Sequence, residues 1–152
     1  LPEGLKVTGW VTVSVVRDGQ FVYYEESHNI ITTVGKDFIS AQLGSSSPSS
    51  NGANYIALST DGTAPSASDT SLNGEITSGG LARAQGTYSH TAGANTYTVS
   101  KTFSATASFA GVQKAGLFTA SSGGTMMAEN TFSSVNLVSG DQITITWTIT
   151  IS

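Results

Sequence analysis

The sequence lacks cysteine and carries few charges, and these two absences exclude several classes of protein. Without cysteine there are no disulfide bonds, thiolate zinc sites or cysteine nucleophiles. Charged residues make up 11% of the 152 residues, and six Lys and Arg against ten Asp and Glu give a net charge of −4. Because binding to a phosphate backbone requires clustered cations, we expect no nucleic-acid partner. No apolar run reaches the roughly 18 residues that span a bilayer, so we expect no membrane partner.

The residues that are abundant predict a β-rich domain with many turns. Serine, threonine and 17 glycines dominate the composition, whereas proline occurs three times. Threonine is β-branched and favours strands, while serine and glycine favour turns. A hydrophobic content of 38% and this chain length suit one core. We therefore expect a single all-β domain over residues 1–152.

Two segments near the ends of the chain alternate as half-buried strands do. Residues 7–16 place valines on one face, and Asp18-Gly19 then predicts a tight hairpin turn into a return strand at 21–26. Residues 143–151 alternate large apolar residues with threonine. A strand this apolar must be covered by a second sheet or by a neighbouring subunit.

One segment, residues 31–43, has the period of a short amphipathic helix. Thr32 or Thr33 fits the N-cap, Asp37 fits the positive end of the helix dipole, and Gly44 fits the helix end. No second helix is predicted.

The remaining segments complete an architecture of about eight strands with turn signals roughly every ten residues. This pattern favours a two-sheet antiparallel β-sandwich with jelly-roll or Greek-key connections, and a closed barrel is the second choice. The expected further strands are 55–59, 81–89, 97–109, 112–119 and 125–132, with an N-terminal arm at 1–6 and surface loops at 44–54 and 60–80.

The chain offers few groups for catalysis. His28 and His90 lie in separate segments, and we interpret them as surface or capping residues. Glu25 and Glu26 are adjacent on a strand and so point to opposite faces, which prevents an acid/base pair. No GxSxG, HExxH or phosphate-binding motif occurs. We predict no catalytic residue and no enzyme activity.

Metal and cofactor sites are not predicted either. Asp61, Asp69 and Glu75 share one loop and carry oxygen ligands of the kind that Ca²⁺ prefers. Their spacing does not match an EF-hand, and Asp61-Gly62 is also ordinary turn chemistry. We therefore expect no bound metal and no cofactor.

Aromatic, methionine and lysine side chains are the remaining candidates for contact with a partner. Trp10, Tyr23 and Tyr24 form either a stacking surface for a sugar or protein, or cross-strand packing of the hairpin. One of two adjacent methionines, Met126, would face outward from its strand. Lys101 interrupts an apolar series near an expected strand end. The candidate interface residues are Trp10, Tyr23, Tyr24, Met126, Lys101 and Lys114.

Four segments resemble a class of small structural proteins of tailed bacteriophages and related archaeal viruses. Residues 9–25 resemble the opening hairpin of that class. The run HNIITTVGKDF at 28–38 resembles its "N-L-I-T-x-x-G" segment before a helix. The run YIALSTDGTAPSASDT at 55–70 resembles "Y-I-A-L-G-T-G-x-T-A-P-x-x-x-D-T", and KAGLF at 114–118 with the last strand resembles "E-A-G-L-F" and a threonine-rich strand. Ser59 replaces the expected glycine, and Lys114 replaces the expected acidic residue.

This resemblance covers residues 7–151 and implies a virion part. Members of the class occur among head-decoration, head-fibre, tail-fibre and minor tail proteins. Our first hypothesis is therefore a non-enzymatic capsid decoration subunit on the capsid exterior, with copies of itself (a trimer) and the major capsid protein as partners. The second hypothesis is a tail-fibre or baseplate module that binds a host surface glycan. The third is an extracellular filament subunit assembled by strand donation.

Overall fold

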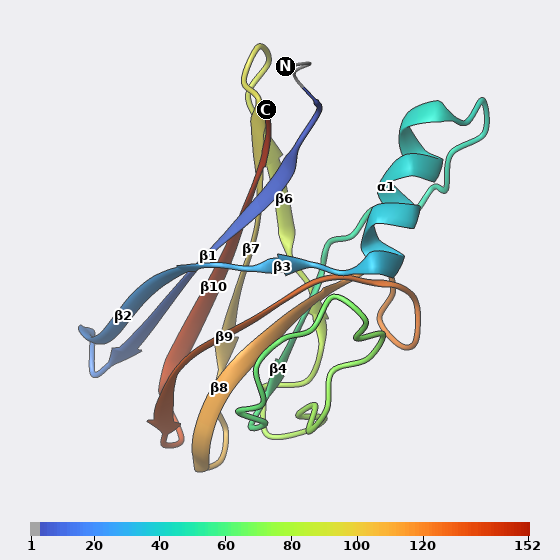
Figure 1. Ribbon diagram of the computed structural model, residues 1–152. Helices are drawn as coiled ribbons and strands as arrows, with labels where there is room; N and C mark the ends of the chain where they lie inside the picture. The colour runs from blue at the N-terminus through green and yellow to red at the C-terminus, as the bar shows by residue number, and fades with distance from the viewer. Residues whose placement is uncertain (1–3) are drawn as a thin grey trace.

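The computed structural model describes residues 4–152, which form two five-stranded antiparallel sheets packed face to face (Figure 1). Sheet A has the order β2-β1-β10-β7-β6, and sheet B has the order β3-β9-β8-β4-β5. The predicted two-sheet β-sandwich is confirmed and the barrel is not formed, while the jelly-roll assignment stays a prediction. The elements are β1 (Val7–Arg17), β2 (Gln20–His28), β3 (Ile30–Ile31), α1 (Thr33–Gly44), β4 (Tyr55–Ser59), β5 (Ala84–Gln85), β6 (Thr87–His90), β7 (Thr96–Ser104), β8 (Phe109–Phe118), β9 (Met126–Leu137) and β10 (Gln142–Ile151).

The core lies between the sheets and is built mainly by the two strands with the cleanest alternation. β10 pairs with β1 on one side and with β7 on the other, so it is central to sheet A. The predicted cover of the last strand by a second sheet is confirmed, because its inward side chains are fully buried against sheet B. These inward residues are Ile143, Ile145, Trp147 and Ile149 of β10 and Val11, Val13 and Val15 of β1.

The β1–β2 hairpin turns at the predicted dipeptide. Asp18 has φ 51° and Gly19 has φ 78°, the left-handed values that a two-residue turn of this hand requires. A bulge between Val15 and Val16 then shifts the register, and the return strand extends to His28. The hairpin therefore forms a long outer part of sheet A.

Both lateral edges of the sandwich are closed by chain that passes from one sheet to the other. At the first edge, the chain leaves β2 at Asn29 and enters sheet B as β3, and the Asn29 amide donates to Gly9 O at 3.1 Å. At the second edge, Gly86 separates β5 from β6, and its amide donates to Asn54 O at 2.7 Å. These crossings connect the two sheets at both edges of the sandwich.

The helix is shorter at its start than predicted. α1 begins at Thr33, not residue 31, because Ile30 and Ile31 pair with β9 as β3. Thr32 is the N-cap, as predicted, and its Oγ1 accepts from the Gly35 amide at 2.9 Å. The first turn holds no acidic residue, so the predicted dipole role of Asp37 is wrong.

The longest alternation does not form one strand. β7 ends at Ser104, and the chain bends over residues 105–108 before β8 begins in sheet B. The bend is held because the Ala105 amide donates to Asp141 O at 2.9 Å, while the Gly140 amide donates to Ala105 O at 2.8 Å. Period-two patterning cannot distinguish one long strand from two that belong to opposite sheets.

Three other boundaries differ from expectation. The segment 81–89 forms two short strands, β5 and β6, because of the crossing at Gly86. Part of the predicted arm belongs to sheet A, since Lys6 and Ser152 exchange backbone hydrogen bonds of 2.7 and 2.9 Å; residues 1–3 lie outside the described residues. The loop 60–80 is not wholly at the surface, because Leu72 and Ile76 within it are buried.

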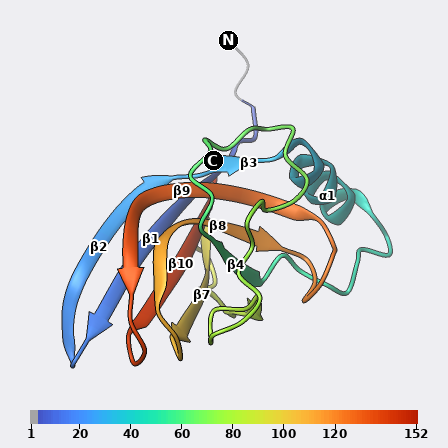
Figure 2. The ribbon, with the colours of Figure 1, turned by 90° about the horizontal axis from the view of Figure 1, so that it is seen from below.

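α1 stands at one end of the sandwich and is held there by β9 (Figures 1 and 2). Thr32 Oγ1 donates to Met126 O at 2.5 Å, and the Thr32 amide donates to Met127 O at 3.1 Å. Gly35 lies directly on the Met127 backbone, where a Cβ would come 2.8 Å from Met127 Cα. Within residues 4–152, no helix has the length and apolar character of a membrane-spanning segment.

Candidate functional site

The outward face of sheet A is lined by hydroxyl groups on three adjacent strands. β10 directs isoleucine and tryptophan toward the core and threonine outward, and outward residues of β1 and β7 align with those threonines. We call this surface the hydroxyl face. Its rows across β1, β10 and β7 are Thr8–Thr150–Thr96, Trp10–Thr148–Thr98, Thr12–Thr146–Ser100 and Ser14–Thr144–Thr102.

The hydroxyl face is ordered and uncharged. Ser100 Oγ lies 3.0 Å from Thr146 Oγ1, and Thr102 Oγ1 lies 2.8 Å from Thr144 Oγ1, so neighbouring strands hydrogen-bond through their side chains. Threonine also has few χ1 rotamers because it is β-branched, which restricts where its hydroxyl points. None of the rows contains a charged residue. The face therefore offers donors and acceptors in preset positions to a neutral, polar partner.

Aromatic residues border the hydroxyl face along β1 and β2. Trp10 is half-buried and pairs in register with His28, and their rings meet edge to face with centroids 4.7 Å apart. A hollow of about 330 Å³ lies beside this pair, and Thr148 and Thr150 form part of its wall. An indole beside ordered hydroxyls joins an apolar surface to hydrogen-bonding groups.

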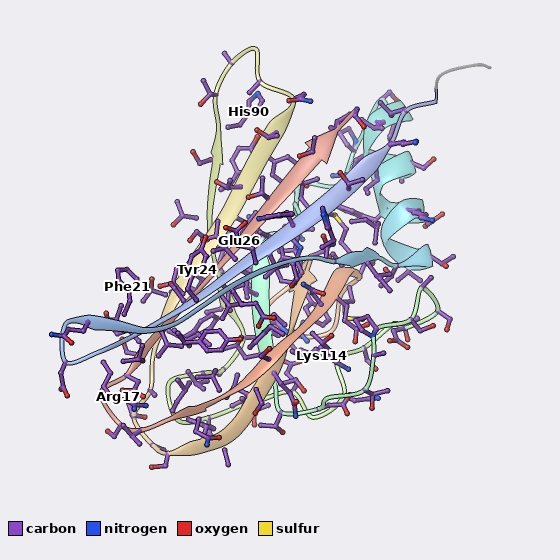
Figure 3. All side chains as sticks on the ribbon, turned by 60° about the vertical axis from the view of Figure 1, so that its left-hand side comes forward. Arg17, Phe21, Tyr24, Glu26, His90 and Lys114 are labelled. Carbon is purple, nitrogen blue, oxygen red and sulfur yellow. The ribbon has the colours of Figure 1, made fainter. Side chains whose placement is uncertain are left out.

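Tyr24 and Glu26 extend this border along β2, as Figure 3 shows. Tyr24 is 62% exposed, and its hydroxyl donates to Glu26 Oε1 at 2.7 Å. This hydrogen bond to the carboxylate raises the pKa of the Tyr24 phenol. The phenol therefore stays protonated at neutral pH, and the carboxylate keeps free lone pairs for another donor.

Tyr23 does not share the surface of Trp10 and Tyr24. It points to the opposite face of β2, where its hydroxyl lies 2.5 Å from Glu25 Oε2 and 2.6 Å from Ser133 O. Burial, reinforced by the Glu25 carboxylate, raises the pKa of this phenol. Glu25 also accepts from the Ser133 amide at 2.6 Å. These contacts join β2 to β9, so Tyr23 closes the sandwich, and the opposite orientations predicted for Glu25 and Glu26 are confirmed.

Three other candidate interface residues lie inside the fold or on its inward side. Met126 is fully buried, because β9 directs it into a small cluster with Leu72 and Phe118, so it does not face outward. Lys101 lies in the middle of β7, not near a strand end, and is opposite Ile145. Lys114 is 2% exposed and therefore presents no charge to a partner.

Lys114 is instead the centre of a buried ion-pair cluster. Its Nζ lies 2.7 Å from Asp61 Oδ2 and 3.4 Å from Glu129 Oε1. The hydrogen bond from Lys114 lowers the pKa of Asp61. Burial raises the pKa of Glu129 to about 7, and the neighbouring Asp69 carboxyl adds to this effect. The cluster ties the loop 60–80 to β8 and β9.

Both departures from the resembled viral pattern lie at this cluster. Ser59 and Lys114 are register partners on β4 and β8. The Ser59 hydroxyl donates to Asn73 O and accepts from the Asp61 amide at 2.9 Å. The two replacements therefore hold the same loop, Lys114 through the Asp61 side chain and Ser59 through the Asp61 backbone.

The three acids considered for calcium are not all brought together, because Asp61 and Asp69 lie at the Lys114–Glu129 cluster and Glu75 does not. Asp61 pairs with Lys114, while Glu75 pairs with Arg83 at 2.6 Å. Asp69 accepts from the Ser66 amide at 2.9 Å. In the part of the chain that the structure describes, no group of three or more metal-ligating side chains is found.

Reasoning from sequence missed the hydroxyl face as a site, although its signal was present. Every outward residue of the last strand from Thr144 to Thr150 is threonine, and Thr98, Ser100 and Thr102 repeat that pattern on β7. The pattern identifies the solvent side of each strand. It does not reveal that the first, seventh and tenth strands are neighbours.

Comparison with known proteins gives one family. Residues 29–150 match the model of the family described as podophage GP4 fiber I protein gp80. No curated protein and no solved structure matches the chain. The matched segment runs from the crossing after β2 to the end of β10, so it includes all of sheet B, α1 and the strands β10, β7 and β6 of sheet A, whereas β1 and β2 precede it. The match covers well over half of the sequence, and it agrees with the resemblance to viral structural proteins. The chain belongs to the podophage GP4 fiber I protein gp80 family.

Proposed function

We propose that this domain is a non-enzymatic module of a phage fibre that binds a neutral carbohydrate on the host surface through its hydroxyl face. The observation that carries the proposal is the set of ordered, uncharged hydroxyls beside Trp10. A sugar ring offers hydroxyls that exchange hydrogen bonds and a C–H face that packs on an aromatic ring.

The size of the hydroxyl face also favours a small ligand. Four outward positions along a strand span roughly 20 Å, and three strands span about 10 Å between their axes. A specific protein–protein interface needs roughly 800 Å² on each partner, which is more than this area provides. A short oligosaccharide fits within it. Each such site binds its oligosaccharide weakly, and repetition of the module along a fibre increases the overall avidity.

The test is a titration of the protein with a panel of bacterial surface oligosaccharides at up to millimolar concentration, followed by NMR or calorimetry. We expect binding to at least one glycan. Thr148→Val, which keeps the side-chain shape and removes one hydroxyl, is expected to weaken that binding about tenfold, and Trp10→Ala more strongly. Tyr88→Ala is the matched control, because Tyr88 is an exposed aromatic residue outside the face. Absence of binding across the panel, or equal loss in the Tyr88 variant, would refute the proposal.

A second candidate is decoration of the capsid exterior, in contact with the major capsid protein. The match to a phage fibre family and the resemblance to virion proteins support it, and the uncharged face can form one part of a larger contact with a protein lattice without electrostatic repulsion. Particles with and without this protein should then differ in resistance to heat. Thr148→Val and Trp10→Ala would detach the subunit from particles while glycan binding stays absent. Equal resistance of the two particle preparations would exclude cementing.

A further inference from the structure

An apolar groove lies between α1 and the end of the sandwich. It measures about 640 Å³, and Leu5 and Leu43 on its rim are 68% and 66% exposed. We call it the α1 groove. Its lining is mainly apolar and comes from both ends of the chain, from α1 and from the β6–β7 hairpin; it includes Val7, Phe38, Ile39, Tyr88, Tyr97 and Ile151.

A second apolar feature projects at the other end of the molecule. Phe21 and Val22, next to the β1–β2 turn, are 76% and 49% exposed. β1 separates the two features, because Val7 at its start lines the groove and Arg17 at its end adjoins the turn. Eleven residues of strand cover about 33 Å. Figure 1 shows the hairpin and α1 at opposite ends.

The two features also carry opposite charges. Lys6 and Lys36 line a hollow that shares Leu5, Val7, Ile39 and Leu43 with the α1 groove. Neither lysine forms an ion pair within the described residues, whereas Arg17, Arg83 and Lys114 all do. Asp37 is also on α1, and the depression that it lines shares Phe38 and Gln42 with the α1 groove, so two lysines and one acid border this end of the molecule. At the hairpin, Asp18 lies at the turn, and the neighbouring Arg17 is engaged by Asp141 at 2.7 Å.

We propose that the β1–β2 hairpin of one copy of this chain docks in the α1 groove of the next copy, head to tail. Phe21 and Val22 enter the groove, and Asp18 lies against Lys6 and Lys36. The hairpin is suited to insertion because its turn is a tight two-residue turn with positive φ at Asp18 and Gly19, and because Phe21 and Val22 beside it are exposed. Since each copy uses two different surfaces, the contact repeats and produces either a closed ring or a linear chain.

The test is sedimentation velocity and light scattering of the full chain from micromolar to millimolar concentration. We expect association into a closed ring or into species longer than dimers. Phe21→Ser and Leu43→Glu should each weaken it at least about tenfold, because Phe21 is the largest exposed apolar residue of the hairpin and the glutamate would place a charge on the apolar rim of the groove. Both residues are exposed, so neither variant should unfold the domain. Val138→Ser is the control, because Val138 is an exposed apolar residue that belongs to neither feature. A protein that stays monomeric throughout would overturn the proposal.

A mixing experiment distinguishes head-to-tail contact from symmetric contact. A mixture of the Phe21→Ser and Leu43→Glu variants retains one intact hairpin and one intact groove, on different chains. It should form heterodimers and no longer species. A symmetric hairpin–hairpin or groove–groove contact would instead produce homodimers of one variant alone, and that result would refute the proposal. Asp18→Lys should weaken association, and adding Lys36→Glu to the same chain should restore it. If the double variant stays weak, Asp18 does not contact Lys36 in the assembly, and that part of the proposal is refuted.

Discussion

Replacing Gly35 with alanine tests how α1 is held on the sandwich. In an exposed helix interior, Gly→Ala stabilises by about 1 kcal/mol, because alanine has the higher helix propensity. At Gly35 the new Cβ would lie 2.8 Å from Met127 Cα and would also overlap Met127 O. These are backbone atoms of β9, so the contact cannot be relieved by a side-chain rotation. The helix must move away from the strand.

The cost of that movement can be worked out from the contacts it breaks. Overpacking of this kind costs about 1–3 kcal/mol. The hydrogen bonds from Thr32 to Met126 O and Met127 O contribute about 1 kcal/mol each. After the gain in propensity of about 1 kcal/mol is subtracted, we expect Gly35→Ala to lower the free energy of unfolding by about 2–4 kcal/mol. The direction is opposite to that for an ordinary helical glycine.

Urea unfolding measures this change as a shift of the midpoint at constant m value. Gly44→Ala is the matched control, since it makes the same substitution in the same helix with no atom within 4 Å of the new Cβ. We expect Gly44→Ala to be neutral or stabilising by up to about 1 kcal/mol. If Gly35→Ala were equally harmless, α1 would not be docked on β9 through Gly35, and the α1 groove would lose one wall.

Three further predictions concern the buried cluster and the edge crossing. The free energy of unfolding should fall by up to about 3 kcal/mol as pH rises from 4.5 to about 7, because buried Glu129 keeps a proton that the unfolded chain releases. Urea unfolding across this pH range should show the fall, and Glu129→Gln should abolish it. The same pH dependence in the Glu129→Gln variant would contradict the raised pKa of Glu129. Lys114→Met should destabilise the protein by about 2–3 kcal/mol in thermal unfolding, because it leaves the partly buried Asp61 carboxylate and buried Glu129 without their cation. A loss below about 1 kcal/mol would show that the cluster does not hold the loop. Gly9→Ala should cost about 1–3 kcal/mol, because its Cβ would overlap the Asn29 side chain, and Asn29→Ala should relieve most of this loss; additive effects in a double-mutant cycle would refute the contact.

Much of the fold follows from clear local patterns in the sequence. The β1–β2 turn was predicted because Asp18-Gly19 adopts positive φ with little strain, and both φ angles are positive. The N-cap was predicted from a threonine before an amphipathic segment, and Thr32 accepts from the Gly35 amide. These features depend on residues within one turn of each other, so neighbouring sequence is sufficient to specify them.

The differences arise where distant parts of the chain meet. From the local sequence alone, Lys114 is expected to be solvated. It is buried because Asp61, from a loop, and Glu129, from β9, both pair with it. Helix α1 begins two residues later than predicted because β9 is available to pair with Ile30 and Ile31. The residues around Lys114 and those around Ile30 and Ile31 do not indicate which distant segment each will contact.

The sequence by itself determined the β class, the hairpin, the helix and the side of each strand that faces water, because alternation and turn chemistry act over a few residues. Only the tertiary structure decided that β1, β10 and β7 are neighbours, and thereby assembled the hydroxyl face from residues near both ends of the chain. It also set Phe21 and the α1 groove at opposite ends of β1, because Phe21 pairs with Val16 and Val7 lines the groove. Strand order depends on the closure of the whole core and on long-range pairing, and no short segment contains that information.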